Sequence, residues 1–321
     1  MSIKPKTKYL FIHKNIIIMN ATHDVRRLQL VILRVGVAIA ILCKIMVEFN
    51  DLEFLFTTRG IVPGVLINGL RSPFTLSLPA MVEFFHITNE PAFLKGLFLI
   101  YFCAAQLLFL GLFTRWSAAI CFIIHLLLFN GYNLVTFGFD GFLFSLLFYN
   151  LIFPVGKVLS LDACFFKFAR KPINEQYLNL CIRLLQFHLC VVYLTAGIAK
   201  LKGHEWIAGT AVWSAINQPQ FFTPFTGWIK SLASIPFISL IWCWGTLLAE
   251  VGFPFFIWIK HYRIGQFALL SILLMHVFIG LAMGLQLFAW IMIVFDLAAF
   301  GGVFLLATSK DQKADGFQFY L

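Results

Sequence analysis

The sequence predicts an all-α protein, a polytopic bundle of about eight membrane-spanning helices with both termini in the cytoplasm. Of its 321 residues, 61% are hydrophobic and only 12% are charged. Soluble domains have about 45–50% apolar and about 25% charged residues. The mean hydropathy is +0.90, and 39 phenylalanines suit contact with lipid or an aromatic-lined cavity. This composition excludes a soluble globule, a disordered chain and a secreted disulfide-rich mini-protein.

Eight apolar runs approach the length of a spanning helix, which is about 17–25 residues. They are Leu28–Phe49, Phe93–Phe113, Trp116–Thr136, Phe137–Val155, Leu178–Lys200, Ile235–Ile259, Ile264–Met283 and Leu285–Ala307. The fourth run is the weakest, because Asp140 and Gly141 interrupt its start.

The basic residues support this count. With the N-terminus in the cytoplasm, fifteen of the 24 Lys and Arg residues fall in inner segments and five fall in outer segments. Cytoplasmic loops of membrane proteins carry an excess of Lys and Arg, so the bias favours an even number of spans. It also accounts for the formal net charge of +10, which therefore does not point to nucleic acid.

The predicted organisation is a basic cytoplasmic tail (1–27), a single transmembrane domain (28–307) and a short cytoplasmic tail (308–321). Either Met1 or Met19 is the start of translation. Residues 50–92 and 201–234 form the long outer loops. In the first, Ser77–His86 is expected to form a short helix at the membrane interface. In the second, tryptophans are expected at the level of the lipid headgroups.

Several kinds of site have no support in the sequence. The seven cysteines include no CxxC pair, so they are interpreted as small core residues. His125, His188 and His276 lie on separate predicted helices with no metal-binding spacing, which argues against a metal centre. Motifs typical of hydrolases, NTPases and dinucleotide-binding folds are missing.

Ionisable residues inside a membrane are costly and therefore need a reason. Arg34, Arg183 and Glu250 are predicted near the inner side, where the arginines would extend to the headgroups or pair with Glu250. Asp296 lies in the middle of the last span, and pairing with another span is its default explanation.

A second set of polar residues is predicted near the outer side. Its members are Lys44, Glu48, His125, Asn130, Asn133, Asp140, Lys200 and His276. Lys44 and Glu48 are four residues apart, so they share one helix face and are able to pair. The convergence of acidic and basic groups from several helices favours a cavity that opens to the outside.

One stretch of the sequence indicates a particular family more specifically than the overall composition does. From Gln186 it reads QFHLCVVYLTAGIAKLKGHEWIAGTAVWSAI, with the pattern Tyr-x-x-Ala-Gly-x-x-Lys-Leu over Tyr193–Leu201, followed by Trp206 and Gly209. This pattern resembles the HTTM (horizontally transferred transmembrane) family, the bacterial relatives of the membrane part of vitamin K-dependent gamma-carboxylase. The segments GLFTRWSA, FGFDGFLFSLLFYNLIFPVGKVLSLD and MHVFIGLAMGLQLFAWIMIVFDL extend the resemblance from Asp24 to about Leu306.

The resemblance implies a location in the bacterial inner membrane and a role for Lys200. The matching lysine of the animal enzymes is regarded as the base that acts on reduced vitamin K. An apolar setting favours the neutral amine that such a base requires. Asp140 falls where the animal enzyme carries a functional histidine, and the large lumenal part that binds the protein substrate is missing here. Carboxylation of glutamate is therefore doubtful, although a quinol-like ligand still fits.

Three hypotheses follow. The first is a membrane enzyme with an outward-facing pocket for a reduced quinone, in which Lys200, Asp140 and His276 are catalytic. In it His125, Asn133, Tyr193 and Trp206 line the cofactor site, with no metal. The second is a non-catalytic factor whose cavity holds a lipid or a small secreted peptide. The third, a transporter, ranks last because the sequence shows no inverted repeat of broken helices.

Overall fold

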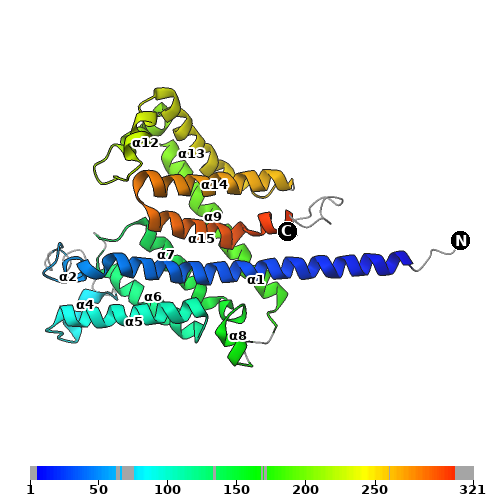
Figure 1. Ribbon diagram of the computed structural model, residues 1–321, viewed down its shortest axis with the longest axis horizontal. Helices are drawn as coiled ribbons and strands as arrows, with labels where there is room; N and C mark the ends of the chain where they lie inside the picture. Colours follow the sequence, from blue (N-terminus) through cyan, green and yellow to red (C-terminus); the bar gives the residue numbers. More distant parts are fainter. Residues whose placement is uncertain are drawn as a thin grey trace. The chain divides into compact units, whose positions relative to one another are not determined.

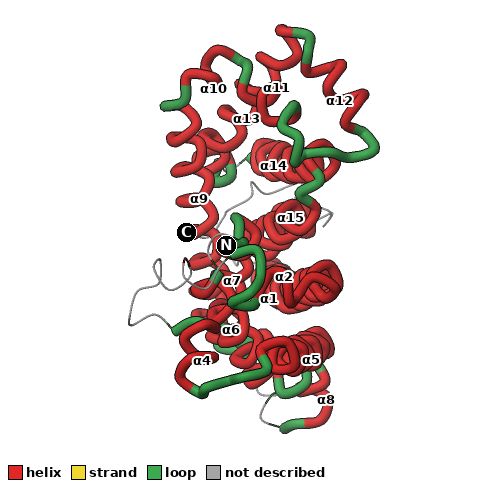
Figure 2. The backbone as a smooth tube through the Cα atoms, turned by 90° about the vertical axis from the view of Figure 1, so that its left-hand side faces the viewer, coloured by secondary structure: helices red, strands yellow, loops and turns green. Residues whose placement is uncertain are grey.

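The computed structural model describes residues 6–62, 66, 76–132, 135–167, 169, 172–259 and 261–307, and for 6–23, 262 and 305–307 it describes only the backbone. Figure 2 draws these residues as helices and loops, with no strand among them. The all-α prediction is therefore confirmed. The predicted site residue Asn133 lies outside the described residues, as do both ends of the chain.

The helices follow the apolar runs of the sequence (Figure 1). They are α1 (Lys6–Glu48), α2 (Leu52–Phe56), α4 (Leu78–Phe84), α5 (Glu90–Leu110), α6 (Thr114–Gly131), α7 (Gly138–Ile152), α8 (Leu161–Phe165), α9 (Glu175–Leu201), α10 (His204–Ala208), α11 (Ala211–Ile216), α12 (Thr226–Ala233), α13 (Pro236–Phe256), α14 (Tyr262–Met283), α15 (Gln286–Phe300) and α16 (Gly302–Ala307). Helix α4 confirms the short helix predicted in the first outer loop.

Six of the described helical stretches are long and apolar enough to cross a membrane. They are Asp24–Phe56, Glu90–Leu110, Thr114–Gly131, Glu175–Leu201, Pro236–Phe256 and Arg263–Met283. Helices α7 and α15 are also apolar but have only 15 residues each. At about 1.5 Å per residue they reach about 22 Å, against a hydrocarbon core of about 30 Å. Each of the eight predicted spans thus contains a helix, while the number of crossings and the orientation of the termini stay predictions.

The chain divides into two compact units. Unit 1 consists of Met1–Gln29, Ile173–Leu285 and Phe295–Leu321, and unit 2 of Leu30–Pro172 and Gln286–Val294. Each is described by itself below. The predicted outer limits of the transmembrane domain, 28 and 307, remain predictions.

In unit 2, helices α5, α6 and α7 pack in sequence order. Helix α5 begins where the Asn89 side chain accepts the Ala92 N–H, and it ends at Gly111, whose φ of 69° suits glycine. The start of α6 is fixed by Asp162, whose carboxylate accepts the N–H groups of Phe113 (2.8 Å) and Thr114 (2.9 Å). These caps give hydrogen-bond partners to N–H groups at the helix starts, which have no acceptor within their own helix.

Arg34 corrects one sequence-based expectation. Its side chain is 1% exposed, which does not fit an arginine extended to the headgroups. Its guanidinium instead donates to the carbonyls of Val155 (2.8 Å), Val158 (3.0 Å) and Leu159 (2.6 Å) in the segment after α7. A planar group with five N–H donors is suited to several carbonyls at once, and a short non-helical segment supplies them.

In unit 1, α9 and α13 form an extensive helix–helix contact. Helix α9 begins at Asn174, whose side chain accepts the N–H groups of Gln176 and Tyr177. The two helices approach at Gly197, where an added Cβ would lie 2.6 Å from Val251 Cγ2 and 3.1 Å from Val251 N. The short helices α10, α11 and α12 lie beside α13 (Figure 2). The missing side chain of Gly197 therefore sets the distance between the helices that carry the candidate site.

Candidate functional site

Lys200 and Glu250 form an ion pair between α9 and α13. The Lys200 Nζ lies 2.7 Å from Glu250 Oε1 and 2.6 Å from Oε2. The side chain of Lys200 is 25% exposed and that of Glu250 is 7% exposed. One amine thus satisfies both oxygens of a nearly buried carboxylate and keeps a third N–H for another partner.

Lys200 lies at the end of its helix, as predicted, but the pairing contradicts the expectation that Glu250 lies on the opposite side of the membrane from it. Helix α9 ends at Leu201, and the chain forms α10, α11 and α12 before α13 begins at Pro236. Because α10 and α11 pack against the first part of α13, the end of α9 meets a later turn of that helix. Counting residues from each helix end therefore misplaces the two groups relative to each other.

Two further features surround this ion pair. The Lys200 Nζ lies 5.4 Å from the ring centroid of Trp206 on α10, within the range of a cation–π contact. Pro254 lies four residues after Glu250 within α13 and has no N–H to donate to the Glu250 carbonyl. The carboxylate is thus carried by a turn whose backbone hydrogen bonding is interrupted.

Tyr193, Asp296 and His276 form a second polar cluster in unit 1. The Tyr193 hydroxyl donates to Asp296 Oδ1 (2.6 Å), and His276 Nδ1 lies 3.5 Å from Asp296 Oδ2. His276 Nδ1 also lies 3.0 Å from the Ile272 carbonyl, which only accepts, so this nitrogen carries a hydrogen. All three side chains are at most 2% exposed. The expectation that Asp296 pairs with another span is confirmed.

Tyr193 and Lys200 are connected through α9. They are seven residues apart with Gly197 between them, a spacing that places all three on one helix face. Tyr193 also packs against Phe253 of α13, with ring centroids 5.0 Å apart. The two clusters of unit 1 therefore lie about two turns apart along the α9–α13 contact.

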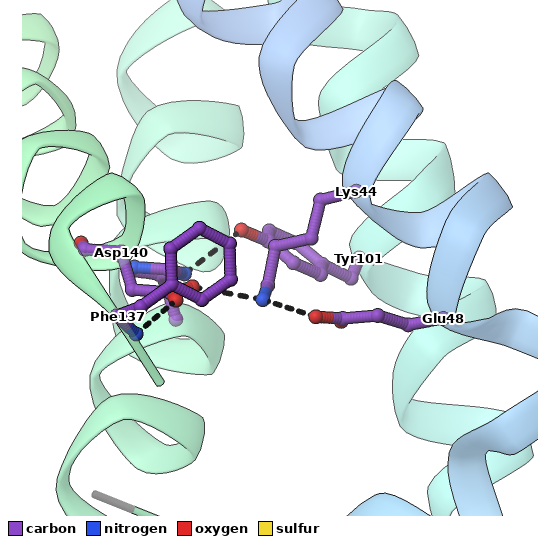
Figure 3. A network of polar contacts seen from close by, with 6 residues as sticks. Lys44, Glu48, Tyr101, Phe137 and Asp140 are labelled. Atoms are coloured by element: carbon purple, nitrogen blue, oxygen red, sulfur yellow. Dashed lines mark hydrogen bonds and ion pairs between the residues drawn. The ribbon is translucent and has the colours of Figure 1, made fainter. Parts of the chain in front are cut away.

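Asp140 and His125 belong to unit 2, where they join a different lysine. The Lys44 Nζ lies 2.5 Å from Glu48 Oε1 and 2.8 Å from Asp140 Oδ1, so it bridges two carboxylates (Figure 3). The other Asp140 oxygen accepts the Phe137 N–H (3.1 Å), which caps α7. The predicted pairing of Lys44 with Glu48 is confirmed, and Asp140 joins it.

His125 and Tyr101 extend this network. His125 Nε2 lies 2.9 Å from the backbone carbonyl of Asp140, which only accepts, so Nε2 carries a hydrogen. In the neutral ring Nδ1 is then an acceptor, and the Tyr101 hydroxyl at 3.4 Å donates to it. Figure 3 shows Lys44 between Glu48 and Asp140, with Tyr101 beside them.

Comparison with known protein families shows to which family the chain belongs. A family model described as the HTTM domain matches residues 73–300, which is more than half of the sequence. The chain belongs to the HTTM family. It is an integral membrane protein, as its apolar helices also indicate. No curated protein and no solved structure matches it significantly.

The HTTM match covers every member of the two unit 1 clusters, whereas Lys44 and Glu48 precede it. Of the predicted site residues, unit 1 brings Lys200 and Trp206 into contact with each other, and Tyr193 into contact with His276. Asp140 and His125 form a separate set in unit 2, and Asn133 is not described. The proposed roles of these residues stay predictions.

Sequence reasoning missed the partners Glu250 and Tyr101. The sequence does indicate that Glu250 has a basic partner, because an acidic residue inside an apolar helix needs one. Nothing in the sequence chooses Lys200 over the arginines as that partner. Tyr101 lies in an apolar run with other aromatic residues and has no distinguishing mark.

Proposed function

We propose that this HTTM protein is an enzyme of the bacterial inner membrane, in which Lys200 exchanges a proton with a reduced quinone-type lipid. One observation carries the proposal. Lys200, in the Tyr193–Leu201 motif, is part-exposed beside the Trp206 ring and is held by a carboxylate with only 7% exposure. An amine with these neighbours has both a proton acceptor at hand and an open side for a substrate.

The chemistry of these residues fits a quinol. A bound quinol would supply a hydroxyl proton and reducing electrons. Trp206 offers a flat aromatic face for a ring to stack on, and Lys200 offers a donor to a ring oxygen. Glu250 would hold the lysine in place.

The proton balance of the pair is simple. Transfer of one proton from the Lys200 ammonium to the Glu250 carboxylate leaves a neutral amine and a neutral acid. The neutral amine is the form that takes a proton from a hydroxyl group. Both oxygens of Glu250 lie within 2.7 Å of Nζ, so the transfer needs no movement of either helix. The proposal therefore assigns Lys200 as the base and Glu250 as its proton partner.

The test uses the full chain in lipid nanodiscs with vitamin K hydroquinone as the probe. Binding is measured by native mass spectrometry, and consumption of the quinol is followed in the presence of oxygen and bicarbonate. The expected result is binding by the wild type and by Lys200→Ala, with consumption reduced at least 100-fold in the variant. Lys202→Ala is the matched control, because Lys202 is exposed and only two residues away. Equal consumption by wild type and Lys200→Ala would refute the role of Lys200.

A second candidate function is a non-catalytic factor that holds a lipid or a small secreted peptide. It is favoured by the mutual satisfaction of Lys200 and Glu250, since both carboxylate oxygens already have a donor. The same experiment separates the two functions. A quinol that binds without being consumed, in wild type and variant alike, supports the factor and not the enzyme.

A further inference from the structure

We propose that Lys44, Glu48 and Asp140 form a proton-binding site in unit 2, which holds one proton on Glu48. The site does not depend on the proposed chemistry at Lys200. Its members come from α1 and α7, and Tyr101 of α5 and His125 of α6 surround them. The lysine amine contacts the acids of α1 and α7, and Tyr101 and His125 extend the network to α5 and α6 (Figure 3).

The first step of the argument is the charge of the cluster. One ammonium lies within 2.8 Å of two carboxylates, so the fully ionised triad has a net charge of −1. Lys44 is 3% exposed, Asp140 1% and Glu48 15%. An uncompensated charge at such low exposure costs several kcal/mol. One added proton makes the triad neutral, with one cation and one anion left in contact.

The surrounding groups do not supply a second positive charge. The described titratable side chains near the triad on the neighbouring helices are Tyr101 on α5 and His125 on α6, and Cys121 on α6 lies near Tyr101. His125 completes its hydrogen bonding as the neutral ring, since Nε2 donates to a carbonyl and Nδ1 accepts from Tyr101. The compensating proton therefore binds to the triad itself.

The second step is the choice between the two carboxylates. Asp140 is surrounded by groups that favour its ionised form: Lys44 Nζ at one oxygen, the Phe137 N–H at the other and the N-terminus of α7. Glu48 Oε1 contacts Lys44, while Oε2 is buried and has no hydrogen-bond partner in the described structure. A proton on Glu48 Oε2 removes a buried charge and disturbs no existing contact. Glu48 is also the most exposed of the three, which gives the proton a route of exchange.

A bound sodium ion is the alternative occupant, and the coordination argues against it. Hard cations are bound by several oxygen ligands at once. Glu48 Oε2 is the only oxygen of the triad that has no donor or cation beside it. We therefore assign a proton, and not a sodium ion, to this site.

The test is infrared difference spectroscopy of the full chain in nanodiscs at neutral pH, where the C=O stretch of a protonated carboxyl absorbs apart from that of a carboxylate. We expect Glu48→Gln to lose the band of one carboxyl per chain. Asp140→Asn should lose the same band although Glu48 is intact, because the remaining Lys44–Glu48 pair is already neutral. Lys44→Met should gain the band of one further carboxyl, because both acids then need protons.

The matched control is Glu53→Gln, which removes a carboxylate that is 54% exposed and paired with Lys95, and we expect no change in the band. Circular dichroism checks that each variant is folded, and Glu48→Gln and Asp140→Asn suffice if Lys44→Met does not fold. Identical bands in wild type, Glu48→Gln and Asp140→Asn would overturn the proposal. A Glu48 band that appears only when sodium is replaced by choline would overturn it as well, because sodium would then be the occupant.

Discussion

The two lysines of the polar clusters, Lys200 in unit 1 and Lys44 in unit 2, are paired in opposite ways. Lys200 is 25% exposed and meets one carboxylate, so its pair is neutral without any further proton. Lys44 is 3% exposed and meets two carboxylates, so its cluster is neutral only when one of the two acids holds a proton. The partly exposed Lys200–Glu250 pair is suited to contact with a substrate. The buried Lys44–Glu48–Asp140 triad, with one more acid than base, is suited to binding a proton and to stabilising the packing of the helices around it. Similar residue types therefore imply different functions.

The largest expected effect is the difference in stability between two matched variants, Lys44→Met and Lys200→Met. The first leaves two acids without a counter-charge at 1% and 15% exposure, and breaking a buried pair costs about 3–5 kcal/mol. The second leaves a single acid, Glu250, which is 7% exposed beside a position that is 25% exposed, and we expect about 1–2 kcal/mol because only one acid loses its partner and the site is partly screened. Thermal unfolding in nanodiscs, followed by tryptophan fluorescence, measures both.

Both variants replace the lysine by an unbranched apolar side chain, so each serves as the control for the other. Equal losses of stability would mean that the two lysines have the same structural role, and the comparison would fail. A larger loss of stability in Lys200→Met than in Lys44→Met would mean that Lys200, and not Lys44, contributes more to the stability of the fold.

The sequence predicts much of the local structure and little of the pairing. Lys44 and Glu48 are found by spacing, because residues four apart on a helix share a face. Asp140 joins them only through the packing of α7 on its neighbours, and Glu250 meets Lys200 only because α10–α12 displace the start of α13. Contacts between helices depend on the lengths and paths of connecting segments, which hydropathy does not report.

A second prediction concerns the close approach of α9 and α13 at Gly197, which allows Lys200 to reach Glu250. Gly197→Ala would place a Cβ 2.6 Å from Val251 Cγ2 and 3.1 Å from Val251 N, so α9 and α13 must move apart. We expect a loss of about 1–3 kcal/mol, as for other overpacked sites, together with reduced quinol consumption. Gly245→Ala in α13 is the control, because its Cβ meets no atom within 4 Å and alanine favours a helix. Equal stability of the two variants would show that Gly197 does not set the distance between α9 and α13.

The third prediction compares the two buried tyrosines. Tyr193→Phe removes a 2.6 Å hydrogen bond to the Asp296 carboxyl, whereas Tyr101→Phe removes a 3.4 Å contact with His125. A buried hydrogen bond of normal length contributes about 0.5–1.5 kcal/mol, whereas a contact at 3.4 Å is longer than hydrogen bonds usually are and contributes less. We therefore expect Tyr193→Phe to lower the unfolding temperature more than Tyr101→Phe. The opposite order would indicate that the Lys44 cluster depends on Tyr101 more strongly than its long contact suggests.

The smallest expected effect tests whether burial, and not the mere presence of an ion pair, makes the two clusters important. Lys95 and Glu53 approach to 2.8 Å, as close as Lys44 and Asp140, but their side chains are 58% and 54% exposed. Exposed pairs contribute about 0–1 kcal/mol, because the surroundings screen them and both side chains lose freedom. Lys95→Met should therefore change stability by less than about 0.5 kcal/mol in the same unfolding assay. A loss similar to that of Lys44→Met would mean that distance outweighs burial, and the contrast between Lys200 and Lys44 would lose its physical basis.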